Sequence, residues 1–283
     1  MNKKYLAIII AVIIVLAGAL GYLAYNGTFT PKKPTLIVFA ASSMTNVIAN
    51  MTQAFESANN CKIVVNSASS STLYTQITSG SPCDVYMAAN NKWVIDLYKS
   101  GLLYKNFYDN FTQNSLCIIV AAGNPKNITS MADLVNLGVR LIVADPSVPV
   151  GEYTNDTVYN IAATWGNASS LLYVTSGAYV NYPAKFAANV VSYEDDDENI
   201  VGDVSLNVGT ADAGIVFYSD WAYGNLTGAQ VQFLPIPASV NTIGTYAICV
   251  PSEATQTALA QTFENYWLSP QGQALLTEFG FGT

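Results

Sequence analysis

The 283-residue sequence contains no histidine, and this absence excludes several kinds of chemistry. The serine and cysteine nucleophiles of common hydrolases are activated by a neighbouring imidazole, which this chain does not have. Zinc sites that use histidine ligands are excluded for the same reason. An enzyme built on a serine nucleophile would therefore need a different base.

Positive charge is also scarce. The chain has 11 lysines and arginines against 19 aspartates and glutamates, and its formal net charge is −8. Proteins that bind a nucleic-acid backbone cluster basic side chains against the phosphates. We therefore expect no nucleic-acid partner.

Cysteine is limited to Cys61, Cys83, Cys117 and Cys249. An even set in a chain outside the cytoplasm is compatible with two disulfides, and four cysteines allow three pairings. The alternative is that the cysteines are small buried hydrophobic residues. The sequence leaves both interpretations open.

A single long hydrophobic run stands at the N-terminus, from Leu6 to Tyr25, after Lys3 and Lys4. A run of about 20 apolar residues is long enough to span a bilayer, and the lysines favour a cytoplasmic N-terminus. We predict that residues 1–25 are a membrane anchor or a cleaved signal peptide, and that 26–34 are a linker. The rest of the chain would be extracytoplasmic, either anchored or secreted.

From Thr35 onward, strand-like and helix-like patterns alternate, which predicts an α/β fold with mostly parallel strands. Two such units, with a chain that returns to the first at its end, predict two lobes around a hinge. We assign residues 35–115 and 246–283 to lobe 1 and residues 116–245 to lobe 2. Ligands of such sheets bind at the carboxyl ends of the strands, here in the cleft between the lobes.

Serines gather where the first two predicted strands end. "VFAASSMTN" places Ser42 and Ser43 before a helix, and "NSASSSTL" places Ser69, Ser70 and Ser71 before the next. A helix start presents unpaired N–H groups and the positive end of the helix dipole, and serine adds a hydroxyl donor. Two such starts side by side predict an anion site without formal positive charge. The alternative is that these serines only cap their helices.

A family resemblance rests on five segments that occur in this order: "VFAASSMTN", "ASSSTLYTQI", "SPCDVYMAANNKWV", "ADPSVPVGEY" and "ADAGIVFYSDW". Over residues 35–283 the chain resembles the molybdate/tungstate-binding proteins of ABC importers. The resemblance implies a type II periplasmic-binding fold whose lobes close on an oxyanion held by hydrogen bonds. It also implies no catalysis, no cofactor, a membrane-embedded permease as partner, and a monomer.

The resemblance assigns the oxyanion donors to the hydroxyls of Ser43 and Ser70 and the backbone N–H groups of Val150 and Ile200, with Ser42 and Ser69 nearby. Phe217 stands where the family has a tyrosine donor, and Tyr218 follows it directly. Because neighbouring strand residues face opposite sides, Tyr218 is able to substitute only if the strand ends there.

Two further sets of residues follow from the resemblance. Asp197 or Glu198 lies near a carboxylate that ligates the metal directly in a related branch, whereas a solvated acidic segment at a helix start is the alternative. Cys117 and Cys249 lie in strands expected to cross the hinge, where a disulfide is plausible.

The sequence therefore predicts a solute-binding protein for molybdate or tungstate. The nearest alternative is the same fold binding sulfate or another oxyanion. More distant alternatives are a serine hydrolase that uses Ser43 or Ser70, an adhesion module without a ligand, and a ferric site built from some of the 18 tyrosines.

Overall fold

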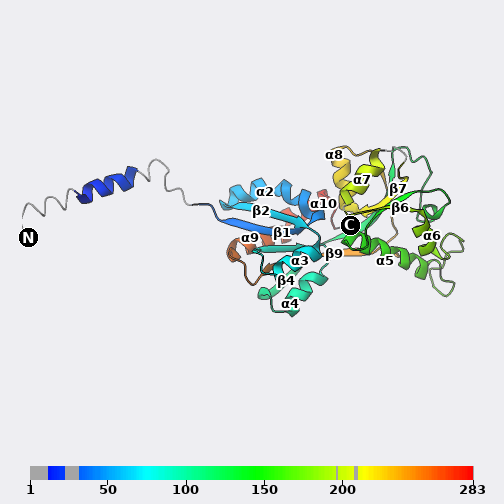
Figure 1. The fold of residues 1–283 in the computed structure, drawn as a ribbon, viewed down its shortest axis with the longest axis horizontal. Helices are drawn as coiled ribbons and strands as arrows, with labels where there is room; N and C mark the ends of the chain where they lie inside the picture. The colour runs from blue at the N-terminus through cyan, green and yellow to red at the C-terminus, as the bar shows by residue number, and fades with distance from the viewer. Residues whose placement is uncertain (1–11, 23–31, 196, 207–209, 283) are drawn as a thin grey trace, which may run out of the picture.

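The structure is a computed structural model that describes residues 12–22, 32–195, 197–206 and 210–282. Residues 12–22 are helical, and in the described part of the chain no helix is long and apolar enough to cross a membrane. The predicted anchor extends over residues 1–11 and 23–25, which lie outside the described residues, as does most of the predicted linker. The rest of the chain forms two bodies joined by long strands (Figure 1).

The first body alternates strands and helices as predicted. Its elements are β1 (Thr35–Ala41), η1 (Ser42–Met44), α2 (Thr45–Asn59), β2 (Lys62–Ala68), α3 (Ser70–Thr78), β3 (Val85–Ala88) and α4 (Lys92–Lys99). Strand β1 pairs in parallel with both β2 and β3. The predicted α/β class is therefore confirmed.

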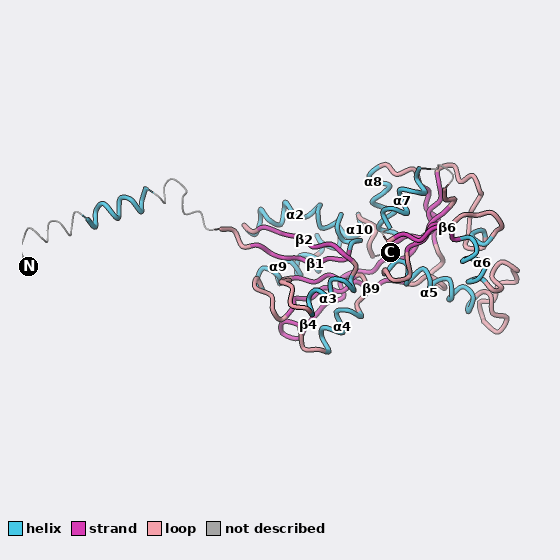
Figure 2. The backbone as a smooth tube through the Cα atoms, viewed as in Figure 1, coloured by secondary structure: helices cyan, strands magenta, loops and turns pink. Residues whose placement is uncertain are grey.

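Two long strands connect the bodies (Figure 2). Strand β4 (Leu103–Ala121) pairs with β9 (Ile243–Pro251) as far as Ser115, and from Leu116 onward it pairs with β7 and β8. The strand order is β2-β1-β3-β9-β4-β7-β5-β6, with β8 also on β4. A single sheet therefore runs through both bodies. The expected excess of parallel strands is not confirmed, because β4 and β9 pair antiparallel with all of their neighbours.

The second body carries the middle of the chain. Its elements are η2 (Asp133–Val135), β5 (Leu141–Ala144), α5 (Pro149–Thr164), α6 (Tyr182–Asn189), β6 (Val190–Glu194), α7 (Asp197–Leu206), β7 (Ala213–Phe217), α8 (Tyr218–Thr227) and β8 (Val231–Pro235). After β9, helices α9 (Thr257–Leu268) and α10 (Pro270–Glu278) return to the first body (Figure 1).

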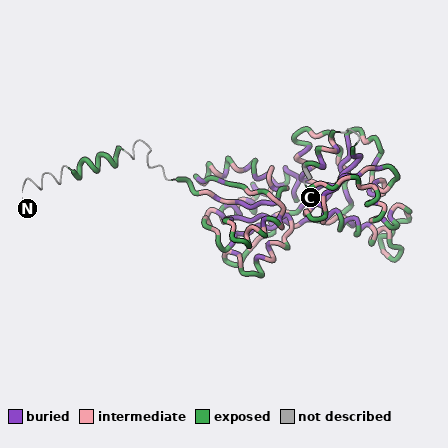
Figure 3. The backbone as a smooth tube through the Cα atoms, viewed as in Figure 1, coloured by how far each residue is buried: buried purple, intermediate pink, exposed green. Residues whose placement is uncertain are grey.

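Each body has its own buried core (Figure 3). One hydrophobic cluster draws its buried residues from 116–240, in the second body. Two others draw theirs from the first body, from residues 36–111 and 246–281. Separate cores joined by a few strands are the arrangement that a hinge requires, and the lobe boundaries at 115/116 and 245/246 stay a prediction.

The predicted disulfide between Cys117 and Cys249 is not formed. All four cysteines, each within the described residues, are buried free thiols. Along β4, Cys249 lies opposite Tyr108, nine positions before Cys117, which pairs with Val216 of β7. At about 3.3 Å per residue the two side chains are far beyond disulfide reach.

Glu264 of α9 is a buried carboxylate, only 8% exposed. Desolvation, with a smaller contribution from the negative charge of Asp109, raises its pKa from 4.5 to about 7. Between these two pH values the folded chain keeps a proton that the unfolded chain has lost. The stability contribution of this group is therefore complete below pH 4.5 and falls as the pH rises to 7.

We expect Glu264→Gln to remove this pH dependence. Its free energy of unfolding relative to wild type should rise by about 3 kcal/mol between pH 4 and pH 8. Urea denaturation at the two pH values measures the difference. Glu278→Gln, at an exposed position of α10, is the matched control. A Glu264→Gln difference that is the same at both pH values would contradict the prediction.

Candidate functional site

One pocket lies where the carboxyl ends of several strands meet the starts of helices. It holds about 390 Å³, part of it open to solvent. Both bodies contribute to its lining, which consists of Ala41, Ser42, Ser43, Ser69, Ser70, Ala89, Val148, Pro149, Val150, Asp195 and Phe217. Six of these residues were predicted from the sequence: Ser42, Ser43, Ser69, Ser70, Val150 and Phe217.

The two serine turns are neighbours because their strands are paired in register. Ala41, the last residue of β1, lies opposite Ala68, the last residue of β2. Both chains therefore leave the sheet at the same edge, and their first residues after the strand face the same space. The parallel pairing brings together hydroxyls that are 26 positions or more apart in the sequence.

Adjacent serines in the second turn have different roles. Ser69 is the N-cap of α3, and its hydroxyl accepts the N–H of Thr72 at 3.2 Å. Ser70 is fully buried, and its Oγ accepts the N–H of Ala89 at 2.9 Å. A backbone N–H is always a donor, so it occupies a lone pair of the Ser70 oxygen and leaves the hydroxyl proton available to the pocket. The capping interpretation therefore holds for Ser69, and the anion-donor interpretation is favoured for Ser70.

Ser43 is positioned by a buried tyrosine. Its Oγ lies 2.8 Å from the hydroxyl of Tyr246, which is fully buried on β9. The Nδ2 of Asn114, on β4, lies 3.3 Å from the same tyrosine oxygen. The Ser43 hydroxyl thus rests on a polar network that reaches both connecting strands.

Helix α5 presents its start to the pocket from the second body. Its N-cap, Val148, has no side-chain oxygen with which to cap the helix, and Pro149 occupies the first turn. The N–H groups of Val150 and Gly151 therefore lack the side-chain acceptor that a serine or aspartate N-cap would supply. A long helix with an uncapped start favours an anion at that point.

Ile200 and Tyr218 lie outside the pocket lining in the described structure. The Ile200 side chain is buried, with its Cγ2 against the Cα side of Gly214. Strand β7 does end at Phe217, but the Tyr218 ring packs against Trp221 and Phe233, at centroid distances of 5.2 and 5.1 Å. Of the two adjacent residues, Phe217 lines the pocket and Tyr218 does not.

The acidic segment contributes a residue that the sequence did not single out. Asp195, directly after β6, lines the pocket and is exposed to solvent. Asp197 and Glu198 begin α7, and their side chains lie outside the described part of the structure. Within the described residues, no three or more Cys, Asp or Glu side chains gather in a way that would hold a metal ion. Direct carboxylate ligation by Asp197 or Glu198 therefore stays a prediction.

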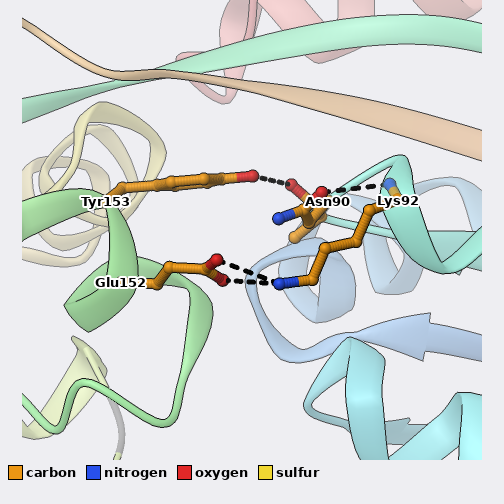
Figure 4. A network of polar contacts seen from close by, with 5 residues as sticks. Asn90, Lys92, Glu152 and Tyr153 are labelled. Carbon is orange, nitrogen blue, oxygen red and sulfur yellow. Dashed lines mark hydrogen bonds and ion pairs between the residues drawn. The ribbon is translucent and has the colours of Figure 1, made fainter. Parts of the chain in front are cut away.

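Contacts between the two bodies flank the pocket (Figure 4). Lys92 Nζ of α4 lies 2.9 Å from a carboxylate oxygen of Glu152, in the first turn of α5. The Tyr153 hydroxyl donates to the carbonyl of Ala89 at 3.2 Å. Within the first body, the Lys92 N–H donates to Asn90 Oδ1 at 3.0 Å. These contacts hold the start of α5 against the turn that supports Ser70.

The pocket presents hydrogen-bond donors without a cationic side chain. Among the described residues no lysine or arginine lines it, and Asp195 is its charged member. Starts of α3, α5 and α8 meet there, together with η1. Such a pocket suits an anion whose oxygens all accept hydrogen bonds. Ala41, Ala89, Val148 and Pro149 gave no chemical signal in the sequence, because they contribute backbone and shape.

Comparisons with known proteins agree with this geometry. Residues 36–282 match the family model described as bacterial extracellular solute-binding protein. The molybdate-binding protein ModA of Mycobacterium tuberculosis is 31% identical over 261 residues, which are 89% of this chain and 88% of that protein.

Two solved structures show the same fold. The periplasmic molybdate-binding protein of Azotobacter vinelandii superposes with a TM-score of 0.67 at 18% identity, over 87% of this chain and 98% of that one. The sulfate-binding protein SubI of M. tuberculosis gives 0.71 at 19% identity, over 88% and 86%. With the family model spanning nearly all of the two-body region, the chain belongs to the bacterial extracellular solute-binding proteins.

Proposed function

We propose that this protein captures molybdate or tungstate in the pocket between its two bodies. The observation that carries the proposal is the convergence of the Ser43 and Ser70 hydroxyls with the uncapped start of α5 at one pocket. The 31% identity to a molybdate-binding relative supports the choice of anion. Membership of a solute-binding family argues against the serine hydrolase alternative.

Binding would proceed by closure of the two bodies on the anion. The first body supplies the Ser43 and Ser70 hydroxyls, and the second supplies N–H groups at the start of α5, among them that of Val150. Since only the closed arrangement offers donors from both bodies, the ligand shifts the hinge equilibrium toward closure. The contact between Lys92 and Glu152, which is present in this structure, would help to hold the closed arrangement.

Selectivity would come from donors of fixed direction at Ser43, Ser70 and the start of α5, although the lining also includes the carboxylate of Asp195. A fully deprotonated oxyanion accepts a hydrogen bond at every oxygen, whereas a protonated one would turn its proton toward a donor at any of these positions. A site of fixed dipoles also lacks the broad attraction that an arginine would give to all anions.

The family suggests the partner and the location. We propose that the loaded protein is a monomer that delivers its anion to a membrane-embedded ABC permease. It would lie outside the cytoplasm. Its N-terminal segment would either anchor it to the membrane or be cleaved off.

Isothermal titration of the full-length chain with molybdate, tungstate, sulfate and phosphate tests the proposal. We expect tight binding of the first two and much weaker binding of the others. Preference for sulfate would retain the fold and the pocket but overturn the choice of anion. If none of the four anions binds, Ser43 and Ser70 have only a structural role.

A further inference from the structure

A buried polar network runs from the pocket into the second body through both connecting strands. It starts at Ser43, continues through Tyr246 of β9 and Asn114 of β4, and ends at Ser219 in the first turn of α8. Tyr246 and Asn114 are fully buried, and Ser219 is 3% exposed. Hydrogen bonds in such a dry environment are strong, and a polar group left unpaired there is costly.

The direction of the hydrogen bonds is set at the far end of the network. The N–H of Ser219 points to Asn114 Oδ1 at 3.4 Å, and Asn114 Nδ2 donates to Ser219 Oγ at 2.8 Å. The Ser219 hydroxyl is itself 3.5 Å from a carboxylate oxygen of Asp220. An amide turned the other way would bring its NH₂ group against the Ser219 N–H, so the backbone fixes the amide orientation.

That orientation makes the tyrosine oxygen an acceptor. Asn114 Nδ2 faces it at 3.3 Å, and Ser43 Oγ lies 2.8 Å from it, in a contact where either hydroxyl is able to donate. Because the tyrosine oxygen already accepts from Asn114, donation of its own proton to Ser43 is the favoured direction. The phenol ring is held by aromatic neighbours on several sides, with centroids of Phe281, Phe217 and Phe111 at 5.5, 6.3 and 6.5 Å. The Tyr246 hydroxyl therefore keeps its position relative to Ser43.

We propose that Asn114 and Tyr246 are positioning residues that make Ser43 a hydrogen-bond donor toward the pocket. With one lone pair of Ser43 Oγ occupied by the tyrosine proton, the serine proton points to the anion. Ser70 obtains the same result from the N–H of Ala89. This inference rests on the proposed function and adds the origin of its selectivity, because donors of fixed direction reject an anion that carries a proton.

The network also connects Ser43 with the second body. Asn114 lies opposite Gly244, where the paired strands β4 and β9 pass from one body to the other, and Ser219 belongs to a helix of the second body. Rotation of one body relative to the other at these strands changes the hydrogen-bond distances from the Asn114 amide to Tyr246 and Ser219. The donor direction of Ser43 is thus tied to the arrangement of the two bodies.

Tyr246→Phe tests the inference through selectivity. The full-length wild type and the variant are titrated with molybdate, and phosphate is added as a competitor, at pH 8, where both anions carry two negative charges and phosphate retains one proton. We expect molybdate affinity to fall about tenfold, because the Ser43 hydroxyl loses the partner that directs its proton to the anion. The ratio of molybdate to phosphate affinity should fall as well, because the Ser43 oxygen becomes free to accept the phosphate proton.

Tyr182→Phe is the matched control. Tyr182 is also fully buried, and its hydroxyl donates to the carbonyl of Met131 at 2.7 Å in the core of the second body. The control loses a comparable hydrogen bond and should keep the wild-type anion ratio. A merely structural role of Tyr246 would make the two variants alike.

Asn114→Asp provides a second test, because an acceptor of the same shape replaces the donor. The tyrosine proton would then turn to the carboxylate, Ser43 would donate to the tyrosine, and an oxygen lone pair would face the anion. The added charge weakens both dianions alike, so it cancels in the ratio, and a shift of the ratio toward phosphate supports the network.

The outcomes separate the two proposals. A wild type that binds molybdate and a Tyr246→Phe variant with affinity and ratio within about twofold of it overturn the network alone. A wild type that binds no oxyanion overturns the proposed function, and the role of the network with it.

Discussion

Ser70→Ala is expected to lower molybdate affinity by about 10- to 100-fold, the range for a hydrogen bond to a charged partner. Ser70 is fully buried in the pocket wall, and its oxygen already accepts the N–H of Ala89. Its removal takes a donor from the anion and also leaves that N–H without its acceptor. Isothermal titration of the full-length variant measures the loss.

Ser71→Ala is the control for this prediction. Ser71 is the next residue, it is only half-buried, and its hydroxyl lies 3.1 Å from that of Ser69, outside the pocket lining. We expect it to bind as the wild type does. If Ser70→Ala and Ser71→Ala both retain wild-type affinity, Ser70 does not donate to the ligand.

Gly151→Ala is expected to reduce binding and stability together. A Cβ at this position would lie 1.9 Å from the carbonyl oxygen of Asp145 and 2.7 Å from that of Ala144. Both are backbone atoms next to β5 and cannot rotate away, so the start of α5 has to move. Overpacking of this kind costs about 1–3 kcal/mol or more. It also displaces the N–H groups of Val150 and its neighbour from the pocket.

Thermal denaturation and molybdate titration of the same preparation check the prediction. Gly177→Ala is the comparison, because a Cβ there has no neighbour within 4 Å among the described residues. It should leave both properties unchanged. Normal binding by Gly151→Ala would show that the first turn of α5 does not need its present position.

Local features of the sequence were enough to predict much of this protein. The alternation of apolar strands and helix starts predicted the α/β class. It also predicted that the serine turns follow the first two strands, and in the structure they follow β1 and β2 directly. Val150, in "VPVGEY", was assigned as a backbone donor from the family resemblance, and the structure places it in the first turn of α5, where proline opens the helix and glycine allows it to approach the β5 end closely. These signals work because strand ends and helix starts depend on neighbouring residues.

Other predictions depended on distances that the sequence does not contain. The Cys117–Cys249 pairing failed because the register of β4 against β9 separates the two residues. Strand β7 ends at Phe217, the condition for Tyr218 to substitute as a donor, but the Tyr218 ring packs against Trp221 and Phe233 and is not in the pocket lining. Asp195 entered the pocket lining from a segment that reads as an ordinary acidic run.

By itself, the sequence determined the chemistry available to this protein. Without histidine and with few cations, it left hydroxyls and helix starts as the means of holding an anion. The tertiary structure decided which hydroxyls serve. Ser69 caps α3, whereas the adjacent Ser70 meets the N–H of Ala89 after β3. The antiparallel pairing of β4 with β9 brought Asn114 and Tyr246 behind Ser43. Hydrogen-bond direction depends on partners far apart in the chain, and only folding brings those partners together.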